Sequence, residues 1–168
     1  MRKIVIFVIL AKCLMAEYYL ECNIDYGIMR YIAQVERSIY RDIGYPYIIS
    51  FNNKIRIKIP FEYKQLDNRS LDCITKENCI EITNFLLKRD ITNLDLGAFQ
   101  LNYIWNKIPI EKYFILNDSY VKACKNIEIL IDRYGYSWET IAKYHSFRKK
   151  HINKYLKLIS NVYKQNKN

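Results

Sequence analysis

The sequence predicts an α+β fold that is mostly helical. Apolar residues recur at helical spacing in several segments, and one pair of short segments has the alternation of β-strands. Glycine and proline are scarce, with 4 and 3 copies in 168 residues. Apolar residues make up 51% of the chain, which is enough for a hydrophobic core and argues against disorder. We therefore expect residues 17–168 to form one domain.

The first elements are a helix and a hairpin. The helix is expected from about Asp25 to Tyr40, because four apolar residues recur there at helical spacing: Ile28, Ile32, Val35 and Ile39. Two strands, Tyr47–Phe51 and Lys54–Ile59, are expected around a turn at residues 52–53. The second strand alternates isoleucine with lysine or arginine, as a half-buried strand does. Residues 61–71 are expected to be an irregular loop.

Two helices are expected in the middle of the chain. One runs from about Lys76 to Lys88, with Cys79, Ile82 and Leu86 on one face. The segment that begins at Asp95 is expected to lead into a short helix that ends near Trp105.

Three more helices follow towards the C-terminus. Asn117 or Asp118 can cap a longer helix, and Gly135 is a suitable stop for it. Ser137 can cap the next, short helix. The last helix is marked by four residues at helical spacing: Ile152, Leu156, Ile159 and Tyr163.

The N-terminus resembles a secretory signal. Two cations, Arg2 and Lys3, precede a short apolar run that is too short to anchor the chain in a membrane. We expect a signal peptide at residues 1–16 with Ala16 as its last residue, and no transmembrane anchor in the mature form. Attachment of a lipid at Cys13 is disfavoured, because Lys12 stands where a small residue is preferred.

Export changes what the cysteines imply. Removal of the signal leaves an even number of cysteines in an oxidising compartment: Cys22, Cys73, Cys79 and Cys124. Four cysteines allow three pairings, and their spacing does not choose among them. No metal site is expected, because no C-x-x-C spacing occurs and the chain has only 2 histidines.

The chain is strongly basic. Its formal charge is +10, which falls to +7 when Arg2, Lys3 and Lys12 leave with the signal. A positive surface suits any polyanion, but an exported protein meets the anionic cell wall before nucleic acid. The cations also alternate along helices and form no single tract, so nucleic acid is not expected as a partner.

Glu36 is the acid that stands out in the expected first helix. Its neighbours one helical turn away are all apolar or aromatic: Ile32, Ala33, Ile39 and Tyr40. An acid on the inward face of a helix is costly unless it has a use, and a buried carboxyl group is suited to proton donation. The alternative is a surface glutamate paired with a cation, and the helix alone favours that alternative.

Three blocks occur in a fixed order: IAQVE at residues 32–36, DLGAFQLN at 95–102 and AKYHS at 142–146. Together they resemble the catalytic-glutamate helix, the G-x-x-Q-[IL]-N block and the Y-H-S block of lysozyme-like lytic transglycosylases. The most similar branch is the small periplasmic one that serves type III and type IV secretion, conjugation and pilus assembly. The resemblance runs from about Cys22 to Tyr163 and implies a lysozyme-like fold with a small hairpin after the Glu36 helix.

The resemblance also implies residue roles. Glu36 would be the catalytic acid, and the hydroxyl of Tyr144 would bond to it. The residues on the substrate side would be Gln100, Asn102, Tyr144, His145 and Ser146. Asp95 is expected to bond the loop and not to be a second catalytic carboxylate. Cysteine positions in the family favour Cys22 with Cys124, which leaves Cys73 with Cys79.

The function implied is cleavage of the β-1,4 bond between N-acetylmuramic acid and N-acetylglucosamine in peptidoglycan, with formation of a 1,6-anhydro product. No cofactor is needed. The expected partners are glycan strands and a secretion, conjugation or pilus apparatus, and the expected compartment is the periplasm. A lysozyme-type hydrolase is one alternative. A non-catalytic wall-binding protein is another, because Arg37 stands where many relatives have serine and residues 147–149 depart from their pattern.

Overall fold

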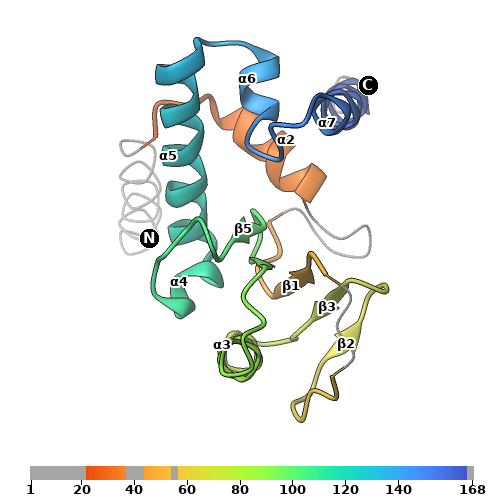
Figure 1. Ribbon diagram of the computed structural model, residues 1–168. Coiled ribbons are helices and arrows are strands. Elements are labelled where there is room, and N and C mark those ends of the chain that lie inside the picture. The colour runs from red at the N-terminus through yellow and green to blue at the C-terminus, as the bar shows by residue number, and fades with distance from the viewer. Residues whose placement is uncertain (1–21, 37–43, 54–56, 166–168) are drawn as a thin grey trace, which may run out of the picture.

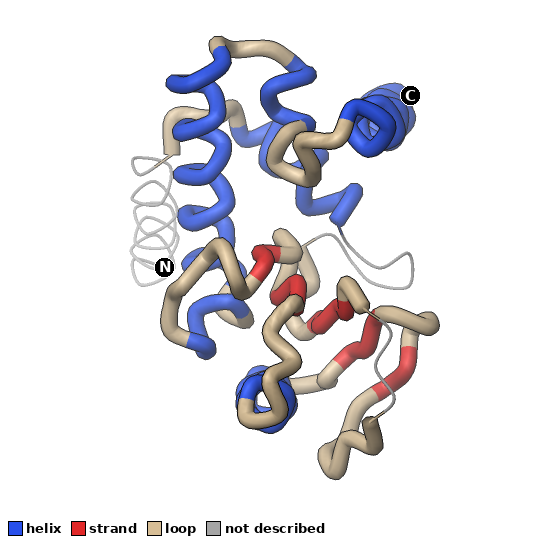
Figure 2. The backbone as a smooth tube through the Cα atoms, viewed as in Figure 1, coloured by secondary structure: helices blue, strands red, loops and turns tan. Residues whose placement is uncertain are grey.

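The computed structural model describes residues 22–36, 44–53 and 57–165. About half of them are helical, and five short strands form one antiparallel sheet in the order β2-β3-β1-β4-β5 (Figures 1 and 2). The predicted α+β class is therefore confirmed. The predicted signal peptide and Arg37 lie outside the described residues.

The helices follow the periodicity of the sequence. Their bounds are α2 Tyr26–Glu36, α3 Lys76–Leu87, α4 Ile110–Tyr113, α5 Leu116–Tyr134, α6 Trp138–Ala142 and α7 Lys149–Gln165. The first helix was expected to reach Tyr40, and residues 37–40 lie outside the described part of the chain. The expected α3, α5, α6 and α7 are all present.

Helix ends follow local side-chain chemistry in most cases. Thr75 caps α3 by accepting from the amide of Asn78, and Ser137 caps α6 by accepting from the amide of Thr140, as predicted for Ser137. Gly135 ends α5 with a φ of 78°, also as predicted. The predicted cap of α5 is wrong. Asn117 and Asp118 lie inside the first turn, and Ile115 holds the cap position without a side-chain bond.

The sheet differs from the predicted hairpin. Its strands are β1 Ile48–Phe51, β2 Lys64–Gln65, β3 Ser70–Asp72, β4 Leu94–Leu96 and β5 Leu101–Asn102. The central strand β1 pairs with β3 on one side and β4 on the other. The predicted partner, Lys54–Ile59, is wrong: residues 57–59 are not in a strand, and residues 54–56 lie outside the described part.

The actual partners of β1 come from segments expected to be a loop and a helix. Residues 61–71 supply β2 and part of β3, and the segment after Asp95 forms the β4–β5 hairpin instead of a helix. Each of these strands has only two or three residues, too few to show alternation in the sequence. Burial of Leu71, Leu94 and Leu96, each at most 1% exposed, holds them in the sheet.

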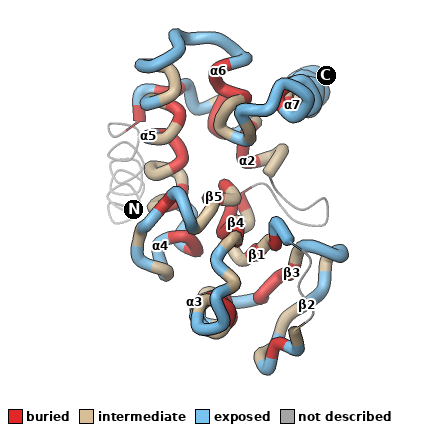
Figure 3. Tube along the Cα trace, viewed as in Figure 1, coloured by how far each residue is buried: buried red, intermediate tan, exposed pale blue. Residues whose placement is uncertain are grey.

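Two groups of elements face each other across the core. Figure 1 shows α2, α5, α6 and α7 in one group and the sheet with α3 in the other. One cluster of buried residues joins Ile28 and Ile32 of α2 to Cys124 and Ile127 of α5 and continues into the sheet. Figure 3 shows buried residues in red. A smaller cluster packs α7 against α6 and α2 through Ala142, Ile152, Tyr155 and Ile159. The end of α2 thereby lies where the two groups meet.

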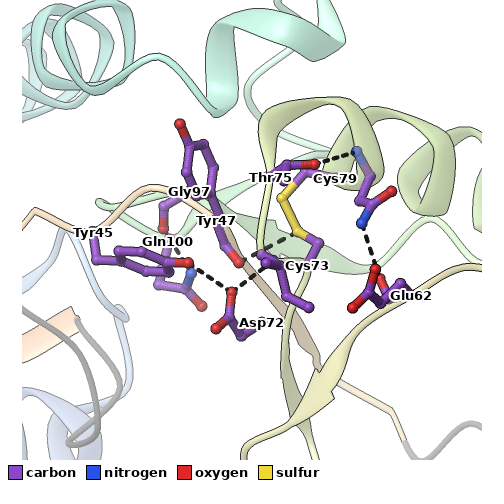
Figure 4. Close-up of a disulfide and its surroundings, with 11 residues drawn as sticks. Tyr45, Tyr47, Glu62, Asp72, Cys73, Thr75, Cys79, Gly97 and Gln100 are labelled. Atoms are coloured by element: carbon purple, nitrogen blue, oxygen red, sulfur yellow. Dashed lines mark hydrogen bonds between the residues drawn. A yellow bond between two sulfur atoms is a disulfide. The ribbon is translucent and has the colours of Figure 1, made fainter.

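Two disulfides close the fold. Cys22 pairs with Cys124, with Cα atoms 5.8 Å apart, and Cys73 pairs with Cys79, at 5.1 Å. This is the pairing that the family resemblance favoured. Figure 4 shows the second bond, which ties the end of β3 to α3 close to the buried carboxyl of Asp72.

The two disulfides should differ in their contribution to stability. They span 102 and 6 residues, and the loop-entropy model gives about 4.7 kcal/mol for a loop of about 100 residues but only about 2 kcal/mol for so short a loop. Replacing Cys22 and Cys124 by serine should therefore lower the free energy of unfolding more than replacing Cys73 and Cys79. Urea unfolding of the two double variants tests this, and equal losses would contradict it.

Candidate functional site

Glu36 is the last residue of α2, and its side chain is only 10% exposed. The buried face of α2 supplies Ile28, Met29, Ile32 and Ala33, so the helix that carries the acid is held firmly by the core. Atom Oε1 of Glu36 is buried and has no hydrogen bond of normal geometry from any described residue. A carboxyl group in this setting has been removed from water without full compensation, which is unusual unless the group is used.

His145 is one polar neighbour of Glu36, and the hydroxyl of Tyr155 is another. Its Nδ1 lies 3.4 Å from Oε1 of Glu36, too far for a strong hydrogen bond but close enough for an ion pair when the imidazole is protonated. Interaction with the Glu36 carboxylate raises the pKa of His145, while partial burial opposes the rise. The sequence placed His145 on the substrate side, and the structure adds a direct link to the acid.

Tyr144 does not form the bond that the resemblance implied. Its hydroxyl donates to the carbonyl oxygen of Phe99 at 2.7 Å and not to Glu36. The side chain is nevertheless near the acid. Burial raises the pKa of Tyr144 well above its usual value, and the negative charges of Glu36 and Asp95 add to the rise. Tyr144 thus connects the turn after α6 to the β4–β5 hairpin.

Asp95 brings a second carboxylate to this region. It lies on β4, opposite Asn102 of β5, and accepts hydrogen bonds from the amides of Asn52 at 2.7 Å and Asn102 at 2.8 Å. Burial raises the pKa of Asp95, the two amides oppose the rise, and the charge of Glu36 adds to it. The expectation that Asp95 bonds the loop is confirmed, but its position near Glu36 and His145 was not anticipated.

The turn between β4 and β5 is built by Gly97 and Gln100. Gly97 has a φ of 76°, and a Cβ there would overlap the carbonyl oxygen of Tyr113, so only glycine fits. The side-chain amide of Gln100 donates to the carbonyl of Gly97 at 2.8 Å (Figure 4). Gln100 was expected on the substrate side, and in the structure its amide nitrogen donates to its own turn.

Asn102 and Ser146 are likewise bonded to their surroundings. Asn102 was expected on the substrate side, and its amide donates to Asn93 as well as to Asp95, so it supports the hairpin. The hydroxyl of Ser146 accepts from the amide of Arg148 at 3.2 Å and lies 3.4 Å from Nδ1 of His151. Ser146 therefore serves the start of α7, and its contacts give no support to a place beside Glu36.

The structure thus gathers Glu36, Asp95, Tyr144 and His145, and adds Tyr155 of α7, whose ring stacks on that of His145. Sequence reasoning missed Tyr155. Its spacing from Ile152 and Ile159 places it on the buried face of α7, so the helical period contained the signal. The position of Asp95 near Glu36 was missed because it depends on contacts between residues distant in the sequence, such as the hydrogen bond from Asn52 to Asp95.

No metal site and no membrane-spanning helix were found within the described residues. No group of three or more histidines, cysteines, aspartates or glutamates there could hold a metal ion. None of the helices there is both long enough and apolar enough to cross a membrane. Compared with models of protein families, with curated proteins and with solved structures, the chain matches none.

Replacing Gly97 should cost more stability than replacing Gly135. Both have a positive φ near 77°, so alanine is strained at either position, but no atom lies within 4 Å of a Cβ at position 135. The overlap with Tyr113 should make Gly97→Ala less stable than Gly135→Ala by about 1–3 kcal/mol. Urea unfolding measures the difference, and equal losses would show that the turn adapts.

The raised pKa of Asp95 predicts a pH-dependent effect. A carboxyl group whose pKa is raised by folding stabilises the fold below its unfolded pKa, and that contribution is lost as the pH rises through the folded pKa. Asp95→Asn should therefore gain stability relative to the wild type between about pH 3 and pH 7. Urea unfolding over this range tests the trend, with Asp132→Asn on the exposed face of α5 as control. A difference that does not change with pH would refute it.

Proposed function

We propose that the protein is a peptidoglycan lytic transglycosylase with a lysozyme-like fold and Glu36 as its catalytic acid. The observation that carries the proposal is the Glu36 carboxyl group, buried at the end of α2 and facing His145 and the β4–β5 hairpin. The ordered sequence blocks supply the reaction class, and all three of them contribute residues to this one region.

Glu36 would act first as an acid and then as a base. In its protonated form it donates a proton to the glycosidic oxygen between N-acetylmuramic acid and N-acetylglucosamine, and the bond to the leaving sugar breaks. The resulting carboxylate then takes the proton of the muramic acid 6-hydroxyl, whose oxygen attacks C1 of the same sugar. The product is a 1,6-anhydro sugar, Glu36 regains its proton, and no water is consumed.

Asp95 favours a second candidate, a lysozyme-type hydrolase. Hydrolases of this kind use a carboxylic acid and a second carboxylate that lies across the scissile bond. In lysozyme itself the acid lies in an apolar pocket, and the second carboxylate is hydrogen-bonded and stays ionised. Asp95 likewise accepts two amide hydrogen bonds, although burial raises its pKa, and Oε1 of Glu36 accepts none of normal geometry from the described residues.

The cellular role we propose is local opening of the wall for a secretion, conjugation or pilus apparatus in the periplasm. Two disulfides suit an oxidising compartment outside the cytoplasm. A basic protein also suits the anionic wall. A wall-binding protein without catalysis would share both properties, so activity decides between them.

Glu36→Gln should abolish the release of fragments from purified sacculi while leaving the fold intact. Glutamine is nearly the same size but cannot donate a proton as an acid does, so the loss expected is at least about 100-fold. Glu81→Gln, an exposed residue of α3, is the matched control and should retain activity. Fragment release is followed by mass spectrometry, and circular dichroism checks folding.

The mass of the fragments separates the candidates. The anhydro product of a transglycosylase is lighter by one water than the product of hydrolysis. If the hydrolase candidate holds, hydrated products appear and Asp95→Asn removes them. Activity retained by Glu36→Gln would reject both enzymatic candidates as argued here, and wall binding without fragments from the wild type would favour the non-catalytic one.

A further inference from the structure

The net positive charge of the protein lies in its C-terminal segment. Residues 140–168 contain eight lysines and arginines and no aspartate or glutamate, whereas residues 17–139 contain 16 lysines and arginines and 17 acids. After removal of the predicted signal, the C-terminal segment therefore accounts for the whole net positive charge. Five of its eight cations belong to α7.

The lysines of α7 lie opposite its buried face. Ile152, Tyr155 and Ile159 pack the helix against α6 and α2. Four exposed lysines alternate with other residues in the sequence and still share one face of the helix: Lys150, Lys154, Lys157 and Lys164. At about 100° per residue, this lysine face points about 180° away from the buried face. Within the described residues, Lys149 is the one lysine of α7 that forms an ion pair, with Glu139 at 3.0 Å.

Exposed aromatic side chains lie close to the start of α7. They come from the end of α5, the connection to α6, the start of α6 and the turn before α7, and we call them the aromatic cluster: Tyr134, Tyr136, Trp138 and Phe147, each at least 46% exposed. The rings of Tyr134 and Phe147 are in contact, with centroids 6.2 Å apart, and Nζ of Lys143 lies 5.1 Å from the ring of Tyr134. Figure 1 shows the α5–α6 connection at the end of the helical group that lies farthest from the sheet.

The aromatic rings indicate which anionic partner this surface fits. Cations alone would suit the anionic wall as well as an anionic bilayer. Tryptophan and tyrosine are enriched where lipid headgroups meet acyl chains, because the ring leaves water there while its polar atom stays hydrated. The ring of Phe147 is 62% exposed and has no polar atom, so its transfer to an apolar phase is favourable. A bilayer offers such a phase, and the polar wall does not.

We propose that the aromatic cluster and the lysine face of α7 attach the protein to the surface of a bilayer that contains anionic phospholipid. The lysines attract the headgroups, and the aromatic rings enter the headgroup region. The lysine face points away from the candidate site, because Tyr155 on the opposite face of α7 stacks on His145. Attachment therefore leaves the surroundings of Glu36 free. The proposal goes beyond the proposed function and does not rest on it.

Sedimentation with vesicles tests the lysine face. The mature chain, residues 17–168, should sediment with vesicles of phosphatidylglycerol and phosphatidylcholine but not with phosphatidylcholine alone. The binding should weaken as the salt concentration rises from about 0.05 to 0.5 M. Replacing Lys150 and Lys157 together by glutamine should weaken it at least about tenfold, because two cations are removed from the contact. Replacing Lys64 and Lys88 together, exposed lysines on β2 and at the end of α3, removes the same charge elsewhere and should change the binding by less than about twofold.

The two tryptophans of the chain report on the aromatic cluster. Trp138 belongs to the cluster, and Trp105, 83% exposed, lies after β5 and outside it. In Trp105→Phe, the emission of Trp138 should shift to the blue when phosphatidylglycerol vesicles are added, because the ring leaves water. In Trp138→Phe, the emission of Trp105 should not shift. Replacing Tyr136 and Phe147 together by serine should weaken vesicle binding at least about fivefold.

Each of three results would overturn the proposal: no sedimentation with phosphatidylglycerol vesicles, equal binding by the two lysine pairs, or no shift of Trp138 in the bound protein. Binding to purified sacculi but not to vesicles would also overturn it and assign the surface to the wall. Circular dichroism checks that each variant folds, and if the serine variant does not, the emission of Trp138 still decides. No readout here uses activity, so a failure to cut sacculi would reject the proposed function and leave this proposal standing.

Discussion

The packing of α2 between α5 on one side and α7 on the other is the constraint on which the site depends. The inward face of α2 is almost fully buried, and the disulfide from Cys22 to Cys124 ties the chain just before α2 to the middle of α5. Because the helix cannot rotate without exposing Met29 and Ile32, its last residue has a fixed direction. Glu36 is that last residue, so its side chain is held where α2 meets the sheet.

The opposite wall of the site is held by polar bonds and not by apolar packing. Asn52, from the end of β1, and Asn102, from β5, both donate to Asp95, which is thereby fixed between two strands. Gly97 allows the hairpin to approach the carbonyl of Tyr113, and Tyr144 bonds the same hairpin from the helical side. A rigid apolar helix therefore faces a hydrogen-bonded hairpin, an arrangement that keeps two carboxyl groups in different environments.

The sequence predicted the helices well because their signals are local. Periodicity and caps lie within a few residues of each other, as at Ser137 and Gly135, so α5, α6 and α7 were placed correctly. Glu36 was singled out by its apolar neighbours together with the ordered sequence blocks, because the helix alone favoured a surface glutamate. The sheet was not predicted, because strands of two or three residues owe their existence to partners such as Leu71 and Leu96, which are distant in sequence.

The site shows the same division between local and distant signals. The candidate residues that lie in ordered sequence blocks could be named, but their bonds could not. Tyr144 was expected to contact Glu36 and instead bonds Phe99, a choice that depends on how the hairpin docks. Tyr155 escaped notice because an aromatic residue on a helix face is ordinarily core, and only the tertiary structure shows which ring it supports.

The two carboxyl groups of the site lie in different surroundings. Two carboxyl groups and one imidazole lie in one partly buried region, where the charge of Glu36 adds to the rise in the pKa of Asp95. Burial raises the pKa of Asp95, and the amide donors of Asn52 and Asn102 oppose that rise, while Oε1 of Glu36 receives no hydrogen bond of normal geometry from the described residues. Of the two carboxyl groups, Asp95 is therefore the one fixed by amide donors, and Glu36 is the one that faces the imidazole of His145.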